Sequence, residues 1–125
     1  MRHPIFVTSC LNESDLQELG RTALADFDRR VTALPHDLCA PFHDEARGLE
    51  TELMFLYKAT VLCVRREEDM GRIAARWKEM VEICDRFLIA LQRLGEKHSG
   101  CGTEIYHDRV LELRRKCQRL QEMHQ

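Results

Sequence analysis

Four histidines and two cysteines, residue types whose side chains can bind a metal ion, form two groups that are far apart in the sequence. The first group has the spacing H-x2-C-x3-H and the second the spacing H-x2-C-x5-H. Imidazole and thiolate together suit zinc, which takes four such ligands in a tetrahedron. The CxxC pairs of a zinc ribbon are missing, so solvated loop residues are the competing interpretation. The candidate zinc ligands are His36, Cys39, His43, His98, Cys101 and His107.

A second metal chemistry is suggested by Glu104 and His107, which form an E-x-x-H pair. Ferritin-like bundles use this spacing to place a carboxylate and an imidazole on one helix face. Such a di-iron site needs a second pair and two further inward glutamates, and the sequence has no second pair. Capping or solvation of a helix start explains Glu104 equally well.

Arg93 and His98 have an R-x4-H spacing that resembles the one in a family of small all-helical ribonuclease domains. The resemblance implies nuclease activity that depends on His98. Leu94 departs from that pattern, because a polar residue usually follows the arginine there. The sequence contains no Gly-rich phosphate loop, G-x-S-x-G elbow or H-E-x-x-H pair, so no catalytic residue is assigned.

The six cysteines suggest a disulfide framework only if the chain is secreted. The N-terminal apolar run is too short for a signal peptide and lacks a small-residue cleavage pattern. Cys63, Cys84 and Cys117 lie inside helical patterns, where a free cysteine behaves as a small apolar residue. We therefore expect reduced thiols in a cytoplasmic protein.

Composition limits the classes of function. A chain of 125 residues with 44% hydrophobic and 32% charged residues is expected to form one soluble globular domain, residues 1–125. The net charge of −2 provides no basic field for a phosphate backbone, so no nucleic-acid partner is expected unless a local patch exists. The longest helical pattern has a charged side that includes Arg86 and Arg93, which excludes it as a membrane span.

Apolar residues that recur every three or four positions predict four helices, at roughly 13–34, 45–66, 69–94 and 104–123. A short extended segment precedes them. Because the connections are short, sequential helices are expected to be antiparallel neighbours in an all-α, up-down-up-down four-helix bundle. The first and third connections then lie at the same end, which brings the two histidine and cysteine groups together.

The second half of the helix predicted at 45–66, residues 53–64, is apolar nearly all round. A monomer rarely exposes a large contiguous apolar patch, so this helix is expected either to lie centrally or to contact another subunit. Homodimerisation is the simplest cover for its second face, and folding of Ile5, Phe6 and Val7 over it is the alternative. The prediction is a non-enzymatic interaction or assembly module, a homodimer or a complex with another protein, with anchors Met54, Phe55, Val61 and Leu62.

Overall fold

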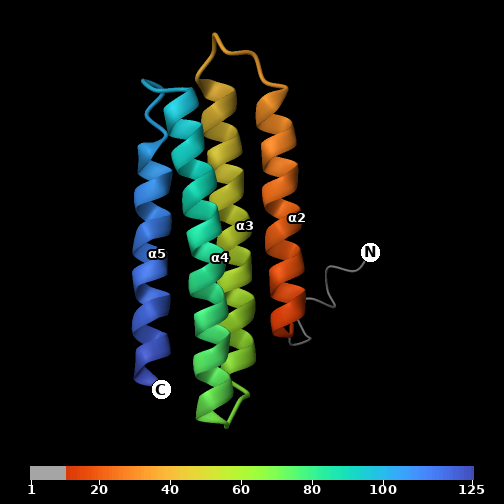
Figure 1. Cartoon of the computed structure of the whole chain (residues 1–125), viewed down its shortest axis with the longest axis vertical. Helices are drawn as coiled ribbons and strands as arrows, with labels where there is room; N and C mark the ends of the chain where they lie inside the picture. Colours follow the sequence, from red (N-terminus) through yellow and green to blue (C-terminus); the bar gives the residue numbers. More distant parts are fainter. Residues whose placement is uncertain (1–10) are drawn as a thin grey trace.

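A computed structural model describes residues 11–125, and four α-helices make up most of this part of the chain (Figure 1). The helices are α2 (Glu13–Thr32), α3 (Ala40–Val64), α4 (Met70–Lys97) and α5 (Glu104–Met123). They run alternately up and down, which confirms the predicted all-α antiparallel bundle. The predicted extended segment, with Ile5, Phe6 and Val7, lies outside the described residues.

Two helix starts were predictable from their capping residues. At α2, the Asn12 side chain accepts a hydrogen bond from the Asp15 backbone N–H at 2.8 Å, and the Asp15 carboxylate accepts one from the Asn12 N–H. At α4, the Asp69 carboxylate accepts from the backbone N–H groups of Gly71 at 2.8 Å and Arg72 at 3.3 Å. These bonds satisfy N–H groups that have no partner within the helix.

Two helix boundaries were predicted wrongly. Helix α3 begins at Ala40, five residues before the predicted start at 45, with Pro41 in its first turn. A proline is tolerated there because first-turn N–H groups have no partner within the helix. Helix α4 continues through Gly95 to Lys97, whereas the prediction ended it at Leu94. One interior glycine lowers helix propensity by only about 1 kcal/mol, which the burial of Leu94 and His98 around it offsets.

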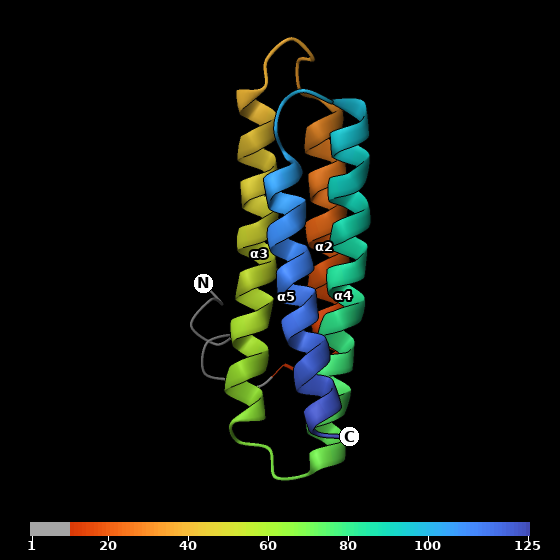
Figure 2. The same cartoon turned by 90° about the vertical axis from the view of Figure 1, so that its left-hand side faces the viewer.

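Helices α3 and α4 form the centre of the bundle, and α2 and α5 lie on opposite sides of them (Figure 2). The outer helices hardly contact each other, and α4 packs most extensively against α5. Because α3 has neighbours in three directions, much of its wide apolar surface is buried inside the chain. This central position is one of the two placements expected from its sequence.

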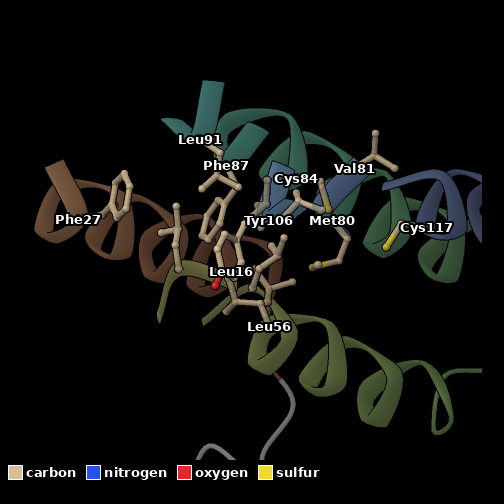
Figure 3. Packing of buried hydrophobic residues seen from close by; sticks show 14 of the residues in the cluster. Leu16, Phe27, Leu56, Met80, Val81, Cys84, Phe87, Leu91, Tyr106 and Cys117 are labelled. Carbon is tan, nitrogen blue, oxygen red and sulfur yellow. The ribbon is translucent and has the colours of Figure 1, made fainter. Parts of the chain in front are cut away.

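The core runs along this central pair (Figure 3). Phe42 and Leu53 of α3 and Met80 and Phe87 of α4 are completely buried. The apolar spacing that predicted α4 placed Trp77, Cys84 and Leu91 on its buried side, and all three are buried. It also placed Met70 there, which is 54% exposed, and it left out the buried Met80 and Phe87. Among the helices of the described residues, none is long and apolar enough to cross a membrane.

Candidate functional site: a groove between α2 and α4

A groove with a volume of about 330 Å³ lies between α2 and α4. Its apolar walls come from both helices. Ile89 is 49% exposed there, while Phe27, Val31 and Leu94 are buried beneath it. The apolar lining consists of Leu24, Phe27 and Val31 from α2 and Ile89, Ala90 and Leu94 from α4.

Three cations line the α4 side of this α2–α4 groove, namely Arg86, Arg93 and Lys97. Their spacing of seven and four residues places them in one strip along the helix. Arg86 donates a hydrogen bond to Gln17 at 2.7 Å, whereas Arg93 and Lys97 form no ion pair within residues 11–125. Asp28 is the one acidic residue in the lining. The groove is therefore locally cationic on a chain whose net charge is −2.

Sequence reasoning did not find this groove. It placed Arg86 and Arg93 on a solvated side of α4, where charged residues are ordinary. The available signal was the run of cations spaced by seven and four beside Ile89. That signal acquires meaning only when α2 is known to flank the same side of α4, which no pattern within α4 reveals.

The predicted anchors on α3 divide into two pairs. Phe55 and Leu62 are 41% and 38% exposed, and one heptad separates them on the outer side of the helix. Val61 packs against the core and Met54 is half-buried. We call the exposed pair Phe55 and Leu62 the α3 ridge. It is smaller than the sequence suggested, because the central position of α3 covers much of the rest.

At the end of the bundle where the first and third connections meet, Cys39 and Cys101 form a disulfide bond. The prediction of reduced thiols is wrong for these two residues. The up-and-down topology brings their Cα atoms to 5.2 Å, a separation typical of disulfides. With both sulfurs bonded to each other, neither is a thiolate ligand for zinc. The bond also removes the support that reduced thiols gave to a cytoplasmic location.

The histidines predicted as ligands at this end pack against aromatic and backbone groups. The buried His98 ring lies 3.6 Å from the Phe42 ring and 5.1 Å from the His36 ring, centroid to centroid. His43 donates from Nε2 to the carbonyl oxygen of Cys101, and its Nδ1 lies 3.4 Å from the Tyr106 hydroxyl. A carbonyl oxygen only accepts, so this contact requires the tautomer with the proton on Nε2.

The remaining metal candidates lie apart from this cluster. His107 faces its neighbour Asp108, with Nδ1 and Oδ1 3.7 Å apart, and Glu104 is exposed at the start of α5. Within the described part of the chain, no three histidine, cysteine, aspartate or glutamate side chains are close enough together to hold a metal ion. Neither the predicted zinc ligands nor the ferritin-like pair is assembled into a site in this structure.

The two residues of the ribonuclease-like spacing are placed differently from each other. Arg93 is exposed on the edge of the α2–α4 groove, and His98 is 8% exposed beneath its ring contacts. His98 therefore offers little surface to a substrate. Nuclease activity stays a prediction of the sequence.

Burial lowers the pKa of His98, and the nearby His36 and Lys97 lower it further. Because the folded protein takes up this proton at a lower pH than the unfolded chain does, the unfolded state binds more protons just below the ordinary pKa of 6.5. Stability should therefore fall as the pH drops through about 6.5. Thermal unfolding at several pH values should show this loss in the natural protein and less of it in His98→Gln. Equal slopes in the two proteins would contradict the assignment.

Comparisons with models of protein families, with curated proteins and with solved structures find no match to this chain. The function must therefore be inferred from the chemistry of the α2–α4 groove, the α3 ridge and the disulfide-linked end.

Proposed function

We propose that this protein is a non-enzymatic interaction module that binds an amphipathic helix of a partner protein in the α2–α4 groove. The observation that supports this proposal is the groove itself, with apolar walls from two helices and charged residues along one edge. Amphipathic helices bind to such grooves by burying their apolar face and leaving their polar face in water. The groove provides both kinds of contact.

The dimensions of the groove suit a short helix. From Arg86 to Lys97 the α4 side extends about 16 Å, or about three helical turns. The outer helices α2 and α5 lie on opposite sides of the central pair, so a further helix placed over α2 and α4 would not collide with α5. Covering the exposed half of Ile89 would contribute on the order of 1 kcal/mol.

This proposal can be tested with a designed amphipathic peptide of about 14 residues, which spans about four turns. We expect the peptide to change backbone amide chemical shifts chiefly around Leu24, Ile89 and Ala90. Ile89→Asp should weaken binding by about 1 to 3 kcal/mol. The matched control is Ile105→Asp on α5, because Ile105 is 48% exposed but lies outside the groove. Equal affinities of the two variants, or shifts confined to other surfaces, would contradict the proposal.

A second candidate function is self-association through the α3 ridge. Phe55 and Leu62 are large apolar side chains that no described residue covers fully, and one heptad separates them. In a two-fold symmetric dimer with antiparallel α3 helices, Phe55 of each copy would pack near Leu62 of the other. Met54 and Val61 would lie at the margin of that contact.

Leu62→Asp is expected to give a folded monomer if this second candidate is correct. Burial of an unpaired carboxylate in the interface is strongly unfavourable, and a lost anchor weakens association by about 1 to 3 kcal/mol. The measurement is the molar mass by light scattering at several protein concentrations, with circular dichroism to confirm folding. Ile89→Asp serves as the control for an added surface charge. A natural protein that is already monomeric, or a dimer that survives Leu62→Asp unchanged, would remove the α3 ridge from consideration.

A further inference from the structure

We infer that the partner helix is acidic, and that its carboxylates pair with Arg86, Arg93 and Lys97 along the α2–α4 groove. This inference rests on the proposed function and specifies the chemistry of the partner. A helix with acidic residues spaced by three, four or seven positions presents them in a row, as α4 presents its cations. The apolar face of the same helix would then cover Ile89 and Leu24.

The pairing state of the cations supports an external anion. Seven arginines in residues 11–125 form ion pairs with acidic residues of the chain, and other cations of α4, such as Arg72 and Lys78, form none. Arg93 and Lys97 also form none, and they differ from Arg72 and Lys78 because they line an apolar groove, across which no ion pair involves Asp28. Unpaired cations beside an apolar surface attract a ligand that is both apolar and anionic.

The spacing of the cations favours a helix over an amphiphile with a single charged head. Arg86 and Lys97 are eleven positions apart, which is about 16 Å along α4. One carboxylate or phosphate head group contacts only one end of such a strip. A row of carboxylates on a helix of about three turns contacts all of it.

The walls of the groove favour a peptide over a nucleic acid. Single strands bind through phosphate contacts and through stacking of bases on exposed aromatic rings. Phe27 is the one aromatic residue in the lining, and it is only 4% exposed. Asp28 on the opposite wall would repel phosphates and carboxylates alike, but a peptide helix can keep its carboxylates on the α4 side and donate a hydrogen bond to Asp28 from a polar side chain.

Three fluorescent peptides that share one apolar face test the inference. They carry glutamate, glutamine or lysine at the same three positions on the side facing the cations, and a single-stranded oligonucleotide is titrated in parallel. We expect the glutamate peptide to bind about tenfold more tightly than the glutamine peptide, with the lysine peptide weakest. The differences in affinity among the three peptides should decrease when the salt concentration is raised from about 50 mM to about 500 mM, because the charges are exposed to solvent.

Charge reversal on the protein locates the contact. Arg93→Glu and Lys97→Glu should each weaken binding of the glutamate peptide and strengthen binding of the lysine peptide. Arg72→Glu is the matched control, since Arg72 is an exposed cation on α4 that lies outside the groove. Arg72→Glu should leave the ranking of the three peptides by affinity unchanged. Circular dichroism of each variant confirms that the bundle is folded.

The outcomes separate the inference from the proposed function. Equal binding of all three peptides, reduced by Ile89→Asp but not by Arg93→Glu, would overturn the acidic partner and leave the helix-binding module standing. No binding of any peptide would overturn both. Tighter binding of the oligonucleotide than of the glutamate peptide would assign the cationic strip to nucleic acid instead.

Discussion

Replacing both Cys39 and Cys101 with serine is expected to lower the free energy of unfolding by about 4 kcal/mol. The disulfide joins residues that are 62 positions apart, and the segment between them includes α3 and α4. A cross-link of this span restricts the unfolded chain strongly, so breaking it makes unfolding more favourable. For a domain that is stable by about 5 to 15 kcal/mol, this loss is a large fraction of the total.

Urea unfolding of the oxidised protein and of the double serine variant measures this effect. A dithiol reductant should lower the urea midpoint of the natural protein, because Cys39 is exposed to solvent and the bond is accessible. The reductant should not shift the midpoint of the double variant, which is the internal control. If both proteins unfold at the same midpoint under oxidising conditions, the disulfide does not stabilise the bundle.

The disulfide joins the start of α3 to the connection between α4 and α5. Cys39 is the residue directly before α3, and Cys101 lies between the end of α4 and the start of α5. The stacked rings of His36 and His98 come from the same two connections. The bond therefore does not link α2 to α4, and α2 is held beside α4 by core packing and by the contacts of Gln17 with Glu79 and Arg86.

Phe87→Ala is expected to lower the free energy of unfolding by about 3 to 5 kcal/mol. The side chain is fully buried at the centre of the molecule (Figure 3). It also packs near Gly20 of α2, where an added Cβ would lie 4.0 Å from its ring. Removing the ring leaves a cavity that the neighbouring helices, held by their own packing, fill only in part.

Alanine variants at two α4 positions that are two residues apart, Phe87 and Ile89, separate burial from helix propensity. Ile89→Ala removes an exposed side chain and should change stability by less than about 1 kcal/mol, because Ile89 is 49% exposed. Both substitutions place alanine in the interior of the same helix, so their difference reports the loss of core packing. A similar loss for the two variants in urea unfolding would mean that Phe87 is not a central core residue.

The four helices were predictable because their signals are local. The apolar spacing in α2 and α4 and the caps at Asn12 and Asp69 depend on residues within a turn or two of each other. The same local signals gave the wrong first residue for α3 and the wrong last residue for α4. Pro41 suits a first turn as well as a loop, and Gly95 is retained in a helix by burial of residues around it.

The neighbours of each helix depended on packing that no single segment encodes. The sequence predicted that the first and third connections share one end, and the distance between Cys39 and Cys101 confirms it. It did not predict that their sulfurs form a bond, because thiol pairing requires a separation that spacing along the chain does not give. The histidines around them were read as ligands, yet ring packing of His98 and the carbonyl contact of His43 occupy them here.

By itself, the sequence determined the helical class, the number of helices and their alternating directions, because periodicity, caps and short connections are short-range properties. Only the tertiary structure decided which helices flank one another. Placing α3 and α4 at the centre buried much of the apolar surface of α3 and reduced its expected interface to Phe55 and Leu62. A groove requires two walls, and only packing brings α2 and α4 together to form them. Arg86, Arg93, Lys97 and Ile89, which would be ordinary surface residues on α4 alone, therefore line one groove.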